Sequence, residues 1–215
     1  MTFAASAEIY DRHVGRYVPQ LSRELVSTAG IEPGWRVLDV GCGPGGLTET
    51  LAELVGADHV AAVDPSEPFV ESCRERVPGA DIRVGAAEEL PFAGGEFDAA
   101  LSELVVNFMT DPVAGVGEMQ RVTRPGGVVA SCVWDYAGGM EMLRAFWDAA
   151  LELDPEAPDE GRTMRFCREG ELGELWERCG LADVTAGALV VSARYEDFDD
   201  YWSPFPTGLA PSGAY

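Results

Sequence analysis

The sequence predicts an α/β protein in which a doubly wound, mostly parallel sheet is flanked by helices. Short apolar segments of strand length alternate along the chain with segments whose apolar residues recur at helical spacing. The clearest unit runs from Val37 to Leu47, where an apolar strand passes through a glycine-rich turn into an amphipathic helix. At 215 residues the chain is long enough for one domain that buries about 70% of its unfolded surface.

The expected strands are short and apolar, and the fifth is a nearly continuous apolar run that we place at the centre of the sheet. The strands are expected over residues 36–40, 59–63, 81–84, 97–102, 128–134 and about 184–193. Helical spacing predicts helices over residues 9–21, 47–55, 69–77, 113–122, 140–150 and 172–179. The segment Pro125-Gly126-Gly127 is a turn signal before the fifth strand.

The glycine-rich turn predicts a cofactor site. Gly41, Gly43 and Gly46 fit the pattern G-x-G-x-x-G, in which bare backbone approaches a ligand at a helix N-terminus. A Cβ atom at these positions would block both the tight turn and the ligand. The pattern alone indicates a nucleotide-like cofactor and does not say which one.

Two acidic residues indicate which cofactor fits. Asp39 lies two positions before the first glycine, where its charge would repel the pyrophosphate of a dinucleotide but suits an amino group and a sulfonium. Asp64 ends the next strand, 23 positions after Gly41, where a carboxylate can accept hydrogen bonds from ribose hydroxyls. Together the two acids favour S-adenosylmethionine over NAD.

Four further segments complete a resemblance. Residues 10–17, 86–92, 96–102 and 121–127 resemble, in order, a closing N-terminal helix, an adenine-side loop, a fourth strand and the turn into a fifth. With the glycine loop, they make the chain resemble class I S-adenosylmethionine-dependent methyltransferases, in the small-molecule group that includes quinone-biosynthesis C-methyltransferases. The resemblance covers residues 10–201. It implies a Rossmann-like fold and transfer of a methyl group to a small-molecule acceptor by in-line displacement in a desolvated pocket, leaving S-adenosylhomocysteine.

The resemblance also implies which residues contact the cofactor. They are Tyr17, Asp39, Gly41, Cys42, Gly43, Asp64, Pro65, Ser66, Ala87, Glu88 and Ser102. The family often has Asp where this chain has Ala86, so adenine recognition is expected to rest on the Ala87 backbone and on Glu88. A catalytic base is not identified by sequence. His13 and Glu103 are the candidates at the expected mouth of the sheet, with packing or structural roles as the competing interpretations.

The amino-acid composition limits which partners and ligands we expect for the protein. The 15 basic and 37 acidic residues give a net charge of -22, which argues against a nucleic-acid substrate because phosphate binding needs a basic surface. No apolar run approaches the length of a membrane span and no signal peptide is visible, so we expect a cytoplasmic protein without membrane insertion. Five scattered cysteines are expected to be reduced thiols, and two histidines make a histidine metal site unexpected.

The chain is interpreted as a single methyltransferase domain with four parts. Residues 1–30 form a helical lid, 31–136 the cofactor-binding core, 137–182 a helical insertion on the acceptor side, and 183–215 a late strand and tail. Met and aromatic residues in the insertion suggest an apolar acceptor. Relatives usually add a final strand beside the fifth, and its absence here predicts a sheet edge that a second copy or a partner chain covers.

Two other functions stay open. The same fold serves NAD-dependent oxidoreductases, which NAD protection in a thermal-shift assay would favour. A cofactor-binding but catalytically silent subunit would act through a partner, and co-purification of a second protein without methyl transfer would favour it.

Overall fold

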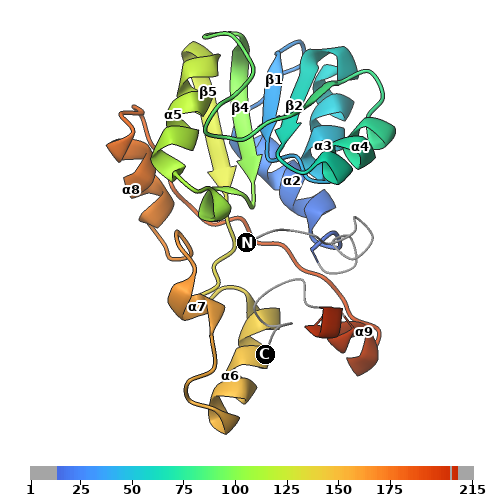
Figure 1. Cartoon of the computed structure of the whole chain (residues 1–215), viewed down its shortest axis with the longest axis vertical. Coiled ribbons are helices and arrows are strands. Elements are labelled where there is room, and N and C mark those ends of the chain that lie inside the picture. The colour runs from blue at the N-terminus through green and yellow to red at the C-terminus, as the bar shows by residue number, and fades with distance from the viewer. Residues whose placement is uncertain (1–13, 204, 208–215) are drawn as a thin grey trace.

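The sheet is parallel throughout, which confirms the predicted α/β fold. The computed structural model describes residues 14–203 and 205–207 (Figure 1). Within them, five strands lie in the order β3-β2-β1-β4-β5, and every neighbouring pair is parallel. The strands are β1 (Val37–Val40), β2 (Val60–Asp64), β3 (Asp81–Val84), β4 (Phe97–Glu103) and β5 (Thr123–Cys132).

Helices cover both faces of the sheet because strand residues alternate between two apolar clusters. On one face, Val37, Ala99 and Leu101 pack against α2 (Val18–Thr28) and α3 (Gly46–Val55). Beside them α4 (Glu67–Arg76) packs on β2 and β3. On the other face, Leu38 and Ala100 pack against α5 (Pro112–Val122) and α8 (Glu171–Arg178). The described residues also form three short 3₁₀ turns, η1 (Ala57–His59), η2 (Val106–Phe108) and η3 (Phe205–Thr207).

A separate apolar cluster lies beyond the carboxyl ends of the strands. It is built on α6 (Glu141–Leu153), α7 (Glu160–Thr163) and α9 (Phe198–Trp202), which together we call the cap (Figure 1). The cap contains buried polar pairs: the Trp147 indole donates to Glu160 at 2.8 Å, and Arg144 pairs with Asp159 at 2.8 Å. Of the segment 137–182, α6 and α7 belong to this cluster, whereas α8 packs into the core of the sheet.

The prediction of a sixth strand over residues 184–193 was wrong. This segment has no strand in the structure, although Val184 and Leu189 pack on the two apolar clusters of the sheet. Its polar backbone finds other partners, as when the Ser192 N–H donates to the Gln20 side chain at 3.3 Å. The Trp176 indole N–H donates to the Val129 carbonyl of β5 at 3.2 Å. Side-chain contacts therefore replace a strand ladder here.

The apolar run had also predicted that the fifth strand is central, and this prediction was wrong. β5 has one hydrogen-bonded neighbour, β4, and so forms an edge of the five-stranded sheet that the described residues build. The expected turn at Pro125-Gly126-Gly127 lies inside β5 as a bulge, because Phe97 pairs with Thr123 while Ala99 pairs with Val128. β5 is half-buried, and its apolar side chains pack against the apolar clusters on the two faces of the sheet.

At the N-terminus, the described chain begins with a turn over residues 14–17 and enters α2 at Val18. The predicted helix over residues 9–21 is therefore shifted where it can be compared, and His13 lies outside the described residues. Among the helices of the described part, none combines the length and the apolar character needed to cross a bilayer.

Candidate cofactor site

The glycine loop between β1 and α3 is held by the neighbouring strand. The backbone N–H groups of Gly41 and Cys42 both donate to the Val63 carbonyl, at 2.8 and 2.9 Å. Gly41 has φ +81°, and a Cβ atom built there would lie 2.5 Å from Cγ2 of Val105, so only glycine fits. Gly45, with φ +97°, then starts α3 without a side-chain cap. The loop thus presents backbone at an open helix N-terminus.

Asp64 ties the end of β2 to this loop. One carboxylate oxygen accepts a hydrogen bond from the Gly43 N–H at 2.9 Å, and the other accepts from the Ser66 N–H at 2.8 Å. Burial raises the pKa of Asp64, while the two backbone N–H groups act in the opposite direction. Each oxygen keeps a lone pair, so the carboxylate can accept further hydrogen bonds from a ligand.

Asp39 lies inside the site, under the loop. Its Oδ2 accepts a hydrogen bond from the Thr48 hydroxyl at 2.7 Å, and its Oδ1 is buried with no hydrogen-bond partner among the described residues. Burial raises the pKa of Asp39 to about 7, and the nearby charge of Asp64 adds to this rise. Asp39 and Asp64 are therefore close enough to interact, as the sequence had led us to expect.

Glu103 ends β4 on the same side. It is 9% exposed, and its Oε2 has no hydrogen-bond partner among the described residues, as is also true of the Ser22 hydroxyl of α2. Burial raises the pKa of Glu103 to about 8, with a further contribution from the charge of Asp39. At neutral pH the site thus holds two carboxyl groups that titrate close to pH 7–8 and lack full hydrogen bonding.

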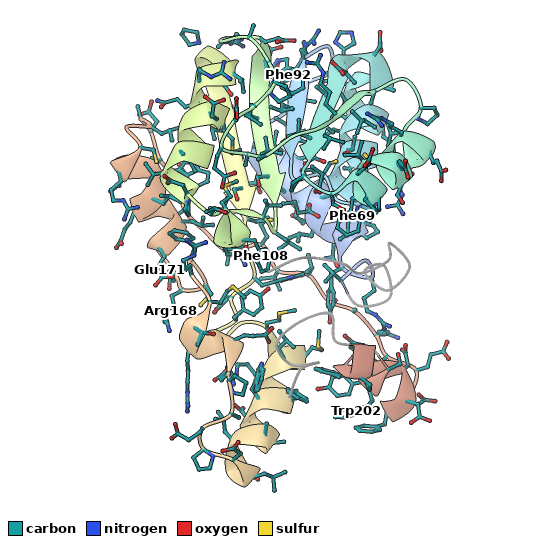
Figure 2. The ribbon with its side chains drawn as sticks, in the orientation of Figure 1. Phe69, Phe92, Phe108, Arg168, Glu171 and Trp202 are labelled. Carbon is teal, nitrogen blue, oxygen red and sulfur yellow. The ribbon has the colours of Figure 1, made fainter. Side chains whose placement is uncertain are left out.

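Asp39 and Glu103 meet in a cavity of about 570 Å³ between α2, the glycine loop and α3, whereas Asp64 does not line it. Asp39, Gly41, Cys42 and Glu103 line its floor, and Gly15, Val18 and Pro19 line the wall formed by the start of α2. Figure 2 shows that Phe69 and Phe108 mark the carboxyl-end edge of the sheet, where open α/β sheets bind ligands, and Phe92 the opposite edge. The unpartnered carboxyl oxygens make this cavity suitable for a cationic ligand that carries N–H donors.

Other predicted site residues have partners of their own. The Tyr17 hydroxyl shares a hydrogen bond of 2.9 Å with the Tyr195 hydroxyl, and its ring meets Trp134 edge-on. The Glu88 carboxylate accepts from the Thr110 and Asp111 N–H groups, at 2.9 and 3.2 Å, so it also fixes the turn before α5.

Four further positions were also predicted to belong to the site. Ala87 is buried in the core cluster, while Pro65 and Ser66 form the turn into α4. Ser102 is fully buried in β4 and its hydroxyl has no hydrogen-bond partner among the described residues.

Sequence reasoning missed Thr48, Ser22 and the contacts of Tyr17. Thr48 carried a usable signal, because a hydroxyl in the first turn of α3 points back toward the strand that precedes the loop. Ser22 carries a buried hydroxyl whose placement no local pattern predicts. Tyr195 carried no signal either, since its hydrogen bond with Tyr17 joins residues 178 positions apart. Within the described ranges, no cluster of three or more His, Cys, Asp or Glu side chains is arranged to hold a metal ion.

The fold and the glycine loop define a class of protein: a Rossmann-like protein with a glycine-rich loop at the carboxyl ends of its strands. Residues 38–131 match the family model of the methyltransferase domain. Residues 38–131 therefore carry a methyltransferase domain, in agreement with the resemblance to class I S-adenosylmethionine-dependent methyltransferases.

Named relatives agree with this assignment. The chain is 40% identical to a demethylmenaquinone methyltransferase of Beutenbergia cavernae, over 64% of this chain and 60% of that protein. It is 28% identical to the demethylmenaquinone methyltransferase of Desulfitobacterium hafniense, over 80% and 78%. An uncharacterized methyltransferase of Schizosaccharomyces pombe is 30% identical over 60% of this chain. The chain spans 53% of the Schizosaccharomyces pombe protein, about half the length of such curated relatives.

Solved structures share the fold. A methyltransferase from Aquifex aeolicus superposes with a TM-score of 0.62 at 20% identity, covering 82% of this chain and 88% of that one. A methyltransferase from Thermotoga maritima superposes with a TM-score of 0.56 at 24% identity, covering 82% and 81%. At these identities the likeness concerns the fold alone.

Proposed function

We propose that the protein transfers a methyl group from S-adenosylmethionine to a small-molecule acceptor. The observation that carries the proposal is the cavity itself: a glycine loop and two incompletely hydrogen-bonded carboxyl groups, Asp39 and Glu103, within a methyltransferase domain. When bound, S-adenosylmethionine supplies an electrophilic methyl group on a cationic sulfur. The part of the protein is then to bind, orient and exclude water, which can contribute roughly 7–11 kcal/mol.

Each residue has a role in this proposal. Asp64 accepts hydrogen bonds from the ribose hydroxyls with the lone pairs left by Gly43 and Ser66. Asp39 holds the ammonium group of the cofactor through its unpartnered Oδ1. The loop residues Gly41, Cys42 and Gly43 provide backbone contact, and Pro65 and Ser66 border the ribose. Adenine contacts fall to the Ala87 backbone and to Glu88, with Ser102 and Tyr17 completing the site.

Glu103 is the proposed base. Its carboxyl group lines the cavity at the end of β4, where an acceptor must meet the methyl group. A cation in the cavity would lower the pKa of Glu103 from about 8 toward the working pH, since opposite charges stabilise the ionised form. The ionised carboxylate could then take a proton from an oxygen, nitrogen or carbon acid. His13, outside the described residues, is the second candidate.

The acceptor is proposed to be an apolar, aromatic molecule of quinone type. Two relatives are named demethylmenaquinone methyltransferases, and a third, from Erwinia billingiae, is named malonyl-[acyl-carrier protein] O-methyltransferase. The cap beyond the strand ends is rich in Met and aromatic side chains, including Met140, Met142 and Phe146. An apolar wall of this kind favours an apolar acceptor.

We also propose that a partner chain or a second copy of this chain covers the β5 edge of the sheet. Analytical sedimentation tests this proposal.

The decisive experiment is calorimetric titration with S-adenosylmethionine and S-adenosylhomocysteine, followed by methyl-transfer assays with labelled cofactor and a panel of hydroxylated aromatics and quinols. Binding of both at micromolar level, with label recovered in an organic extract, supports the proposal. No binding of either overturns it. Thermal protection by NAD instead would favour an oxidoreductase. Binding without any transfer, together with a co-purified protein, would favour a silent subunit.

A further inference from the structure

The first turn of α2 has two functionally distinct sides. Gly15, Val18 and Pro19 line the cavity, so we call residues 15–19 the roof. Arg16, Tyr17 and Gln20 lie one helical turn apart and make their contacts on the opposite side, with residues 192–200. A segment about 180 positions away in the chain therefore holds the roof.

The contact with the most hydrogen bonds is the pairing of Arg16 with Asp200 in α9. Nη2 of Arg16 donates to Oδ1 of Asp200 at 2.9 Å and Nη1 donates to Oδ2 at 3.2 Å, a bidentate arrangement. Nη1 also donates to the Arg194 carbonyl at 3.3 Å, and the guanidinium lies 4.4 Å from the centre of the Tyr195 ring. Asp200 is itself oriented, since its carboxylate also accepts from the Glu196 N–H.

Two neutral contacts continue this arrangement. The hydroxyls of Tyr17 and Tyr195 lie 2.9 Å apart, and the Ser192 N–H donates to Oε1 of Gln20 at 3.3 Å. The hydroxyls are partly buried, and burial raises the pKa of Tyr195. Tyr17 is itself buried to 9% exposure, and its ring packs on Trp134.

The same segment reaches the cap. The Tyr195 ring meets the Tyr201 ring edge-on at 5.5 Å, and the Tyr201 hydroxyl donates to the Met142 carbonyl of α6 at 2.9 Å. Residues 192–201, which we call the strap, thus run from the roof of the cofactor cavity to the cap (Figure 1). Trp202 follows at the outer end of α9 (Figure 2).

We propose that the strap positions the roof over the cofactor cavity, with Tyr195 and Asp200 as positioning residues that slow the release of the cofactor. The proposal rests on the proposed function, because it assigns S-adenosylmethionine to the cavity. α2 begins without a side-chain cap, so its first turn has little local stabilisation of its own. The strap contacts therefore determine the fraction of molecules in which the roof covers the cavity. Apparent affinity falls in proportion to the fraction of binding-competent molecules.

The test compares Tyr195→Phe and Asp200→Asn with Asp199→Asn as matched control. Asp199 lies in the same helix and undergoes the same change of charge, and no contact of its side chain with the roof occurs. Dissociation of S-adenosylhomocysteine is followed by stopped-flow displacement. We expect it to accelerate about fivefold in Tyr195→Phe and about threefold in Asp200→Asn, and to stay unchanged in the control. The double variant Tyr17→Phe/Tyr195→Phe should release S-adenosylhomocysteine at the same rate as Tyr195→Phe alone, since both substitutions remove the same hydrogen bond.

Hydrogen exchange separates this proposal from the proposed function. The hydrogen-bonded backbone amides of Tyr17, Gln20 and Leu21 should exchange faster in both strap variants without any ligand, while those of β1 and β4 stay as in the wild type. Unchanged release rates, or unchanged exchange in the roof, would overturn the strap. If the wild type binds no S-adenosylhomocysteine, the proposed function fails, and roof exchange alone decides whether the strap holds the roof.

Discussion

The carboxylate of Asp64 accepts a hydrogen bond from the Gly43 N–H at 2.9 Å, which joins the end of one strand to the loop that follows its neighbour. The bond links β2 to the β1–α3 connection, and β1 borders the β1–β4 boundary at which the strand order reverses. One side chain therefore both shapes the glycine loop and faces the site proposed for the ribose.

This double role leads to a graded prediction. Asp64→Ala removes the loop contact and the proposed ribose contact, so the affinity for S-adenosylhomocysteine should fall about 10- to 100-fold. Asp64→Asn keeps one acceptor oxygen for a backbone N–H and should lose less. Isothermal titration measures both. Equal affinities of the Ala variant and the wild type would exclude Asp64 from the site.

Gly41→Ala tests the loop without touching a charge. The new Cβ would meet Val105 at 2.5 Å, and φ +81° is strained for any L side chain. We expect a loss of folding free energy of about 2 kcal/mol and loss of cofactor binding. Gly117→Ala is the control, because a Cβ there has nothing within 4 Å and lies in α5, so it should fold and bind normally. Urea denaturation and titration report the two effects separately.

Much of the core could be predicted from the sequence, because its signals are local. The strand at residues 81–84 has the expected bounds, and the first strand begins at Val37, one residue later than expected, because it is a short, mostly apolar run that ends at a glycine turn. The strand, the glycine loop and the following helix were predicted from local spacing, and the structure contains all three, with Asp39 in β1 and Asp64 at the end of the neighbouring β2. Local patterns identify which segments form elements and which face they bury.

The rest depends on contacts between distant segments. Residues 184–193 have strand-like composition, yet an extended segment becomes a strand only if a neighbour offers a free ladder. The Trp176 indole N–H donates a hydrogen bond to the Val129 carbonyl at the β5 edge, and no periodicity in the sequence predicts this contact. The roof contacts of Arg16 and Tyr17 span 184 and 178 positions, so sequence spacing could not reveal them either.

The cap offers a test of stability that is separate from binding. Asp159 is 5% exposed at its side chain and pairs with Arg144 at 2.8 Å, whereas Arg162 lies 3.8 Å away and is 59% exposed. Arg144→Ala leaves a buried carboxylate without its main partner and should cost about 3 kcal/mol. Arg162→Ala should cost under about 0.5 kcal/mol. Urea denaturation compares the two, and similar losses would contradict the assigned geometry.

The buried acids predict how stability depends on pH. Burial raises the pKa of Glu103 to about 8 and that of Asp39 to about 7, whereas both ionise near pH 4 in an unfolded chain, as model peptides do. Between about pH 4 and pH 8 the folded protein therefore keeps protons that the unfolded chain has released. The stabilising contribution of these groups is complete below about pH 4 and is lost as the pH rises through their folded-state values.

Glu103→Gln isolates one of the two groups. Glutamine keeps the shape of the protonated acid but cannot ionise, so the unfolded variant gains no free energy from ionisation at this position above pH 5. Its free energy of unfolding relative to the wild type should rise steadily from pH 5 to pH 8, by roughly 2 kcal/mol or more, and level off above. Glu89→Gln, on an exposed side chain, should show no such trend. Urea denaturation at pH 5, 6.5 and 8 measures the difference. A gap that is constant with pH would mean that Glu103 is ionised in the folded protein throughout this range, and its proposed part as a base that gains its charge only with a bound cation would then fail.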